Sequence, residues 1–330
     1  MKTSILKMLK EACQSHITDI HLTLESSCGL IKFRKRGVME EYGTIEIDEY
    51  KRWINYLKFT AELDINEHKI PQSGKTHFEI EDEIISVRIS TLPISLMNEI
   101  IVIRILDALE TTKSTELFHT PEKYTFFTDY LSQNQGLILF TGPTGSGKST
   151  VMYRLIHELI RQGDRQIISI EDPVEFDIDG IVQVEINEKA QLDYTPLLRG
   201  VLRCDPDIIM FGEIRDKKVA DELIKASLSG HLVLSTFHSK SAKTTLNRLK
   251  EYNILKEELI ESLSLIINQR LIHSLNKSFI IYEYMTKKEI IQYLNNESVS
   301  ISTLSDELSK LHREGMLTDE EYKNYEKKFK

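Results

Sequence analysis

A lysine that follows a run of glycines is the first feature of this sequence with evident chemical potential. The stretch GPTGSGKST, residues 142–150, matches the pattern G-x-x-x-x-G-K-[S/T] in full. Glycines let the backbone take positive φ and approach a ligand closely, so that N–H groups surround an anion. In this pattern the lysine reaches the β and γ phosphates of a nucleotide, and the next hydroxyl faces magnesium. We therefore predict a site for ATP and Mg²⁺ built from Gly142, Pro143, Thr144, Gly145, Ser146, Gly147, Lys148, Ser149 and Thr150, with the Ser149 hydroxyl toward the metal.

Carboxylates follow two later apolar runs. Glu213 comes at the end of the run that begins at Asp207, and a carboxylate there can hold and deprotonate the water that attacks a γ phosphate. We predict that Glu213 is the catalytic base. The position where a strand-end aspartate often supports magnesium is Gly212, so we expect Glu171 or Asp172, at the end of a neighbouring strand, to help hold the metal.

Two histidines flank the run LVLSTF. His231 precedes it and His238 follows it. A single histidine is more often a structural hydrogen-bonding residue than a catalyst, and for His231 this reading stays open. Polar groups at the carboxyl end of a strand can also respond to a γ phosphate and transmit movement, so we predict both histidines as site residues.

The elements that must position these residues alternate between strand and helix. Residues 137–140 are a short continuous apolar run, typical of a parallel strand buried on both faces, and a helix is expected from Lys148 onward. Ligands of such sheets bind outside the carboxyl ends of the strands, which places the acids and His238 beside the glycine-rich loop. Further strands are expected at 166–170, 207–211 and 232–235, with helices at 194–202 and 217–228.

The rest of the chain divides into regions that precede and follow this core. We expect an amino-terminal α/β domain over residues 1–109, a polar linker over 110–120, the P-loop domain over 121–285 and a helical region over 286–330. In the first domain the pattern predicts helices at 5–14 and 48–63, the latter with Trp53 on its apolar side, and strands at 19–24, 30–36, 75–80, 84–91 and 99–106.

The last part of the sequence reads as mostly helical. Helices are expected at 242–252, 255–267, 287–294, 304–311 and 319–328, with two short strands near Leu271 and at 279–284. Ser305 and Thr318 are predicted helix caps, and Gly315 is predicted to end the helix before it.

Composition limits the classes of function. The 330 residues carry a net charge of −9, which argues against a protein that mainly grips nucleic acid, so no direct nucleic-acid partner is expected. No apolar run approaches the length of a membrane span, and the amino terminus lacks a signal-peptide pattern, so we expect a cytoplasmic protein. Three separated cysteines without a C-x-x-C pair indicate neither disulfides nor zinc.

Four stretches, in this order, resemble the motifs of the type II secretion and type IV pilus ATPases. GPTGSGKST resembles the family's Walker A motif, IEDPVEF its aspartate box, LRCDPDIIMFGEIRD its Walker B motif and SGHLVLSTFHSKSA its histidine box. Four further stretches resemble the family's second amino-terminal domain more weakly: TDIHL, IPQSGK, VRISTLP and EIIVIRIL. The resemblance covers roughly residues 15 to 285. It implies an α/β fold with a P-loop, RecA-like parallel sheet core, a smaller amino-terminal α/β domain and a helical carboxyl-terminal region.

The resemblance also implies roles and partners. The chain would be a homo-hexameric motor, attached peripherally to the inner face of the cell membrane through an integral membrane platform protein, and would act indirectly on pilin-like subunits. Glu213 would be its catalytic base, Glu171 its aspartate-box acid and metal-site residue, and His231 with His238 its histidine-box pair. Arg88 and Arg104, which alone would read as solvated edge charges, match amino-terminal arginines that reach a nucleotide in the assembled ring.

Features that this sequence lacks indicate which members of the family it resembles most. The four-cysteine zinc module of the larger assembly ATPases, their additional amino-terminal domain and the AIRNLI-like stretch of retraction ATPases are not found in this sequence. The short form that remains is similar to the competence-pilus ATPase of Gram-positive bacteria, encoded in ComG-type operons, which powers the pilus used for DNA uptake. The alternatives are a type II secretion or pilus retraction ATPase, a DNA-translocating P-loop motor, and a nucleotide-bound scaffold that does not hydrolyse.

Overall fold

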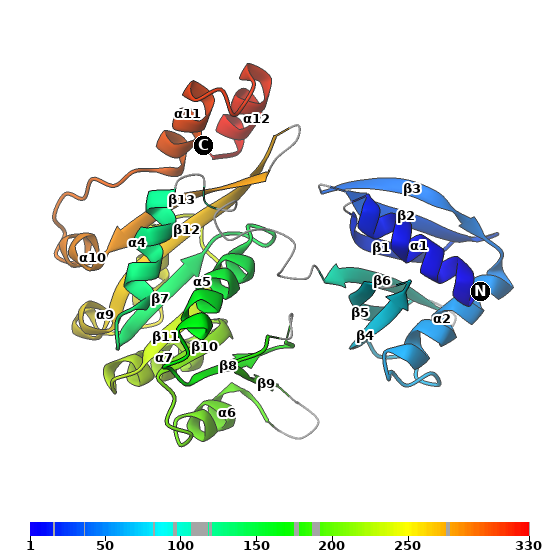
Figure 1. Ribbon diagram of the computed structural model, residues 1–330, viewed down its shortest axis with the longest axis horizontal. Helices are drawn as coiled ribbons and strands as arrows, with labels where there is room; N and C mark the ends of the chain where they lie inside the picture. Colours follow the sequence, from blue (N-terminus) through cyan, green and yellow to red (C-terminus); the bar gives the residue numbers. More distant parts are fainter. Residues whose placement is uncertain are drawn as a thin grey trace. The chain divides into compact units, whose positions relative to one another are not determined.

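The chain forms two compact units, Met1–Ala108 and Leu109–Lys330 (Figure 1). The computed structural model describes residues 1–15, 17–35, 37–81, 83–94, 98–106, 118, 121–174, 178–186, 192–274 and 278–329. The predicted linker, 110–120, lies outside the described residues except for Phe118. That residue is buried and pairs with Ile280, so it is part of the second unit.

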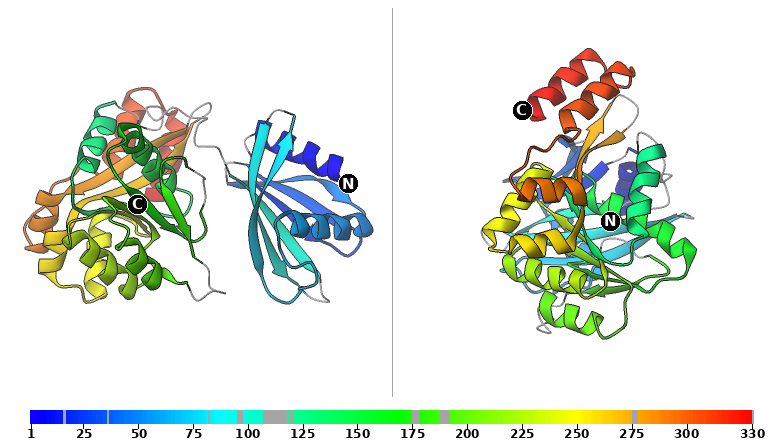
Figure 2. Two further views of the ribbon diagram at one scale, coloured as in Figure 1. Left: turned by 60° about the horizontal axis from the view of Figure 1, so that its bottom comes forward. Right: turned by 90° about the vertical axis from the view of Figure 1, so that its left-hand side faces the viewer.

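The first unit is an antiparallel sheet covered on one face by two helices. Helices α1 (Lys2–Gln14) and α2 (Ile47–Thr60) pack against the same apolar face of the sheet (Figure 2). The strand order is β3-β2-β1-β6-β5-β4. The strands are β1 (Ile17–Leu24), β2 (Gly29–Lys35), β3 (Val38–Ile45), β4 (Gln72–Ile80), β5 (Glu83–Pro93) and β6 (Glu99–Leu106).

Strand periodicity separates the two faces of this sheet. Val87 and Ile89 of β5 are fully buried in the core under the helices, together with Trp53 of α2, as its apolar position predicts. Successive side chains of a strand point to opposite faces, so Arg88 lies on the face away from the helices. The sequence patterns identify five of these strands, whereas β3 is not among the predicted elements because its sequence, VMEEYGTI, does not alternate apolar and polar residues.

The second unit is built on a seven-stranded sheet in the order β13-β12-β7-β11-β10-β8-β9. The pairings from β12 to β9 are parallel, and β13 pairs antiparallel with β12. The strands are β7 (Gly136–Thr141), β8 (Ile167–Glu171), β9 (Val182–Glu185), β10 (Ile208–Glu213), β11 (Leu232–Phe237), β12 (Leu263–His273) and β13 (Ser278–Thr286).

Helices cover both faces of this sheet and produce a three-layer core. Alternate side chains of β7 enter two different clusters: Ile138 packs with helices α4 and α5, and Leu139 packs on the opposite face with α6, α7, α8 and α9. The helices are α4 (Pro121–Leu131), α5 (Lys148–Gln162), α6 (Tyr194–Val201), α7 (Lys217–Leu228), α8 (Ala242–Glu251) and α9 (Lys256–Ser262). This is the α/β core with a parallel sheet that the sequence predicts.

The helix predicted over residues 255–267 is wrong in its second half. Helix α9 ends at Ser262, and Leu263 begins β12, which pairs in parallel with β7. The run LSLIIN is buried throughout, and an apolar run without clear periodicity fits a buried helix and a buried strand equally well. This run forms a strand because it pairs with β7 in the folded protein. Strand β9 was also not predicted.

Three helices, α10 (Lys287–Leu294), α11 (Leu304–Arg313) and α12 (Asp319–Phe329), follow the sheet, and the last two lie beside the ends of β12 and β13 (Figure 1). The cap of α11 is Thr303 rather than the predicted Ser305, since the hydroxyl of Thr303 accepts from the N–H of Asp306 at 3.2 Å. The predicted cap at Thr318 is confirmed by the N–H of Glu321, 3.3 Å away. Gly315, with φ of +73°, follows the end of α11 as predicted.

Candidate nucleotide site

The glycine-rich loop connects the carboxyl end of β7 with the first turn of α5. Gly142, Gly145 and Gly147 all take positive φ, as the pattern predicts, and Gly147 is the amino-terminal cap of α5. A Cβ at Gly142 would lie 2.6 Å from the carbonyl oxygen of Gln269, so only glycine fits there. A Cβ at Gly145 would meet nothing within 4 Å, so the middle of the loop opens outward. The loop therefore presents backbone N–H groups and the positive end of the helix dipole to an anion.

Lys148 places its charge over this loop. Its side chain is buried, and its Nζ donates to the carbonyl oxygens of Gly142 and Pro143, both at 3.1 Å. Ser149 and Thr150 are half-buried in the first turn of α5. An ammonium held over this loop, with a hydroxyl beside it, fits the phosphates and magnesium of a nucleotide, and Ser149 is the residue that would hold the metal.

Glu213 ends β10 next to a shift in register. Phe211 pairs with Ser235 of β11, but Glu213 pairs with Thr236, so Gly212 forms a bulge between them. The hydroxyl of Thr236 donates to the carbonyl oxygen of Gly212 at 2.7 Å and fixes this bulge. Thr236 pairs in turn with Phe140 near the end of β7. Glu213 therefore lies at the carboxyl edge of the sheet, the same edge from which the glycine-rich loop leaves.

The Glu213 carboxylate lies beside an imidazole and a guanidinium. Its Oε1 lies 3.2 Å from Nε2 of His238, and its Oε2 lies 3.9 Å from Nε of Arg215. The Glu213 side chain is 30% exposed, so water can reach it. Arg215 also donates to Asp172 at 2.7 Å and thereby links the ends of β10 and β8. The structure brings Glu213 and His238 together as the sequence suggests.

Glu171 is buried and already engaged by the protein. Its Oε1 accepts from the hydroxyl of Ser169 at 2.7 Å and from the amide of Gln183 at 3.0 Å, and its Oε2 accepts from the hydroxyl of Tyr153 on α5. These contacts tie β8 and β9 to the helix that begins at Lys148. A metal role for Glu171 stays a prediction, and among the described residues no group of three His, Cys, Asp or Glu could hold a metal ion.

The two histidines flank β11, as the sequence predicts, and so lie at opposite ends of this strand. His231 precedes β11, at the end opposite to His238, and its Nδ1 lies 3.1 Å from the carbonyl oxygen of Ala226, to which it can donate. Its own carbonyl oxygen accepts from the N–H of Gly136 at the start of β7. The six residues of β11 separate the two side chains, so His231 supports the opposite edge of the sheet and is not beside the glycine-rich loop.

The two predicted arginines belong to the first unit. Arg88 of β5 pairs directly with Arg104 of β6. Arg104 is 54% exposed and donates from Nε to Oδ1 of the buried Asp19 at 2.9 Å. Asp19 lies in the stretch TDIHL, but no local sequence pattern links it to Arg104. The pairing of β1 with β6 brings the two residues together.

Side chains that sequence reasoning missed support the loop from β12. The amide of Gln269 donates to the carbonyl oxygen of Ser146 at 2.7 Å, and the amide of Asn268 donates to the hydroxyl of Thr141 at 2.8 Å. Both residues are fully buried. Nothing in the local sequence pattern around Asn268 and Gln269 indicates that β12 lies beside β7.

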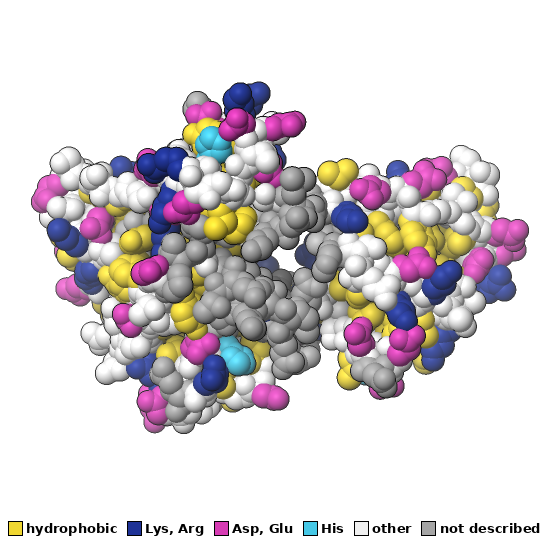
Figure 3. Space-filling view, turned by 45° about the horizontal axis from the view of Figure 1, so that its top comes forward, with side chains coloured by type: hydrophobic (Ala, Val, Ile, Leu, Met, Phe, Trp, Pro, Cys, Tyr) yellow, Lys and Arg dark blue, Asp and Glu magenta, His cyan; other side chains and the backbone are white. Residues whose placement is uncertain are grey.

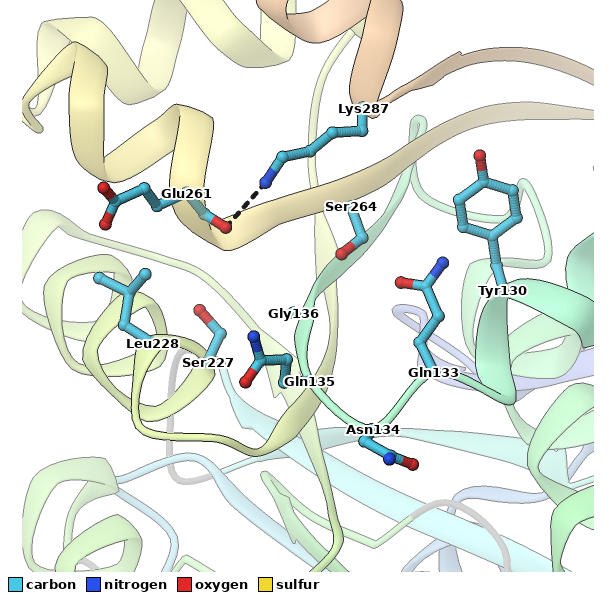
Figure 4. Close-up of a pocket in the computed structure, with 10 residues that line it drawn as sticks. All are labelled: Tyr130, Gln133, Asn134, Gln135, Gly136, Ser227, Leu228, Glu261, Ser264 and Lys287. Carbon is cyan, nitrogen blue, oxygen red and sulfur yellow. Dashed lines mark hydrogen bonds between the residues drawn. The ribbon is translucent and has the colours of Figure 1, made fainter.

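A separate cavity of about 790 Å³ lies at the other edge of the same sheet. Gly136, the first residue of β7, lines it, so the cavity is at the amino end of the strand whose carboxyl end leads into the glycine-rich loop. Figure 4 shows Lys287 donating across the cavity to the carbonyl oxygen of Glu261, at 2.8 Å. Its other lining residues are largely polar: Tyr130, Gln133, Asn134, Gln135, Ser227, Leu228 and Ser264. None of the predicted site residues lines it.

Acidic and basic side chains are interspersed on the face drawn in Figure 3. Within the described ranges, none of the helices has the length and apolar content needed to cross a membrane.

Solved structures resemble this chain over almost its full length. An ATPase of Legionella pneumophila, DotB, matches with a TM-score of 0.79 at 20% identity and covers 98% of this chain and 95% of its own. The pilus retraction motor PilT, solved with bound ADP, matches with a TM-score of 0.75 at 24% identity and covers 96% of this chain and 95% of its own. At these identities the likeness establishes the fold.

Sequence relatives establish the family. The chain is 39% identical over 268 residues to competence protein ComGA of Halalkalibacterium halodurans, which is 81% of this chain and 76% of that protein. It is 41% identical over 271 residues to a HofB homolog, a protein transport protein of Haemophilus influenzae, but the match spans only 58% of that relative's length. The match to a type II secretion system protein E of Pectobacterium carotovorum spans 54% of that relative's length. Residues 1–309 match the family described as Type II/IV secretion system protein, and the chain belongs to this family.

Proposed function

We propose that this chain is an ATP-hydrolysing motor of the secretion and pilus family. The observation that carries the proposal is the meeting of two features at one sheet edge. Lys148 lies over an open glycine-rich loop at the start of α5, and the Glu213–His238 pair follows two neighbouring strands at the same edge. A phosphate loop beside a water-accessible carboxylate is the arrangement that hydrolysis of a γ phosphate requires.

Each residue has a distinct task in this mechanism. Lys148 and the loop N–H groups bind the β and γ phosphates. Ser149 would hold Mg²⁺, which would neutralise charge on those phosphates. Glu213 orients the attacking water and accepts its proton. His238, whose Nε2 lies 3.2 Å from one carboxylate oxygen, holds Glu213 in place. Glu171 holds α5 against β8 and β9 through Tyr153 and Gln183.

The pathway that we propose is assembly of a type IV-like competence pilus used for DNA uptake. Competence protein ComGA of Halalkalibacterium halodurans, to which this chain is 39% identical, supports it. The working form is a homo-hexamer at the cytoplasmic face of the membrane, attached through an integral platform protein and acting on pilin-like subunits. Type II secretion is the second candidate, favoured by the identity to secretion ATPases.

ATP hydrolysis is tested with the variant Lys148→Ala, and Lys256→Ala is the matched control. Lys256 is likewise the first residue of a helix, α9, but it is exposed and lies outside the loop. Lys148→Ala removes the charge that binds the phosphates, so ATP turnover should fall to background while Lys256→Ala keeps the wild-type rate. Turnover of purified Lys148→Ala at the wild-type rate would refute the motor proposal.

The experiment for the pathway uses a deletion strain. Loss of transformation with unchanged export of secreted enzymes supports the competence pilus, whereas the converse supports type II secretion. Membrane association is tested by fractionating cells that lack the platform protein. If the chain still sediments with membranes in such cells, the proposed attachment through that partner is wrong.

A further inference from the structure

The triplet Asn268-Gln269-Arg270 lies in the middle of β12, between β7 and β13. We propose that these three residues are positioning residues that fix the glycine-rich loop and the loop after β11, which carries His238, relative to each other. The inference rests on the proposed ATP hydrolysis and adds residues that act through the loops rather than on the nucleotide itself.

Gln269 supports the glycine-rich loop from one side of β12. Its Nε2 donates to the carbonyl oxygen of Ser146 at 2.7 Å. Its backbone carbonyl oxygen approaches Gly142 so closely that a Cβ there would lie only 2.6 Å from it. The residue is fully buried, so water cannot replace the lost donor if the side chain is changed. Gln269 thus contacts both the first residue of the loop and the residue before its final glycine.

Asn268 and Arg270 point to the other side of the strand, toward the loop after β11. Asn268 donates to the carbonyl oxygen of Ser239 at 3.3 Å as well as to the hydroxyl of Thr141. Arg270 donates from Nη2 to the carbonyl oxygen of Lys240 at 2.8 Å. These two carbonyl groups belong to the two residues that directly follow His238, whose imidazole lies against Glu213.

Arg270 also holds the triplet together. Its Nη1 donates to the side-chain oxygen of Asn268 at 3.1 Å and to the carbonyl oxygen of Gln269 at 2.8 Å. One guanidinium therefore joins the strand that supports the glycine-rich loop to the loop that carries His238. Loss of Gln269 and loss of Arg270 should consequently have different effects: the first should loosen nucleotide binding, and the second should disturb the arrangement around Glu213.

The test measures ADP affinity, ATP affinity and turnover for three full-length variants. Gln269→Leu should weaken ADP and ATP about tenfold alike, because one buried hydrogen bond to the loop is lost. Arg270→Met retains the aliphatic stem, so ADP affinity should stay within about twofold of wild type while kcat falls about tenfold. The control is Ile272→Val, which removes one methylene from the buried part of β12 beyond the triplet. It should lower the melting temperature without changing nucleotide affinity or kcat.

The outcomes separate this inference from the motor proposal. If the wild-type protein turns over ATP but Gln269→Leu and Arg270→Met change only the melting temperature, as Ile272→Val does, the triplet is merely structural and the inference is wrong. If the wild-type protein neither binds ADP nor hydrolyses ATP, the proposed function itself fails. Should Gln269→Leu not fold, Gln269→Asn keeps the amide and shortens its reach by one methylene, and the same weakened binding of both nucleotides is expected.

Discussion

Arg88 and Arg104 lie directly opposite each other on strands β5 and β6, in a row of charges that crosses the sheet of the first unit. Arg88 also pairs with Lys75 of β4, and Arg104 with Asp19 of β1, which in turn pairs with Arg34 of β2. Like charges directly opposite on neighbouring strands are destabilising. Among the residues that the structure describes, this row holds four cations and one carboxylate, a balance of charge that suits a face that meets an anion.

We expect the arginines to act on the nucleotide of a neighbouring subunit. Guanidinium groups that approach a γ phosphate only in the assembled ring stabilise the charge of the transition state, typically by about 10³-fold or more in rate. The double variant Arg88→Ala, Arg104→Ala should be inactive, and so should Glu213→Gln. Mixing the two proteins creates interfaces that pair intact arginines with an intact Glu213, so ATP turnover should partly return.

The mixture is informative only if mixed rings form, which native mass spectrometry of differently tagged subunits can establish. Lys7→Ala is a matched control in the same unit, because Lys7 is exposed on α1, and should leave turnover unchanged. Mixed hexamers that remain inactive would mean that the arginines serve their own subunit or only the fold.

Glu213→Gln should separate nucleotide binding from turnover. Glutamine keeps the shape of the side chain and can still contact His238, but it cannot accept a proton from water, so turnover should fall by about 10²-fold or more. ATP affinity, measured by calorimetry, should stay near the wild-type value. If affinity and turnover fall together, Glu213 supports the structure of the site and is not its base.

Much of this arrangement could be predicted from sequence because local signals and tertiary contacts agree. The glycine-rich loop, β7 and α5 carry strong local patterns, and Glu213 follows an apolar strand whose carboxyl end must face the loop. β12 could not be predicted in full, since its buried run fits either helix or strand. The support given by Gln269 likewise depends on which strand lies beside β7, and residue spacing does not contain that information.

The two histidines should differ in what they support. His238 contacts Glu213, so His238→Ala should lower turnover while ATP affinity remains. His231 bonds to the carbonyl oxygen of Ala226 at the opposite edge of the sheet, so His231→Ala should cost about 1 kcal/mol of stability and leave turnover per folded molecule unchanged. Turnover and urea unfolding of both variants provide the comparison. A large loss of turnover in a stably folded His231→Ala protein would contradict the role inferred from its position.

Glu283 of β13 provides a test that depends on pH. It is buried, and its Oε1 accepts from the N–H of Ala242, the first residue of α8, at 2.8 Å. Burial raises the pKa of the Glu283 carboxyl above its ordinary value of 4.5, although the Ala242 N–H and the charges of Arg270 and Lys243 oppose this shift. A carboxyl with a raised pKa in the folded state binds its proton more tightly there than in the unfolded chain.

The sign of the expected effect follows from this proton balance. Below pH 4.5 Glu283 is protonated in both states and contributes no pH dependence. As the pH rises from 4.5 through the raised pKa, the unfolded chain releases the proton first, so the wild-type protein loses stability relative to Glu283→Gln, whose side chain does not titrate. Above the raised pKa the difference becomes constant. Urea unfolding of both proteins at a series of pH values gives this difference directly, and a wild-type protein that gains stability over Glu283→Gln on raising the pH would show that the Ala242 N–H and Arg270 outweigh burial.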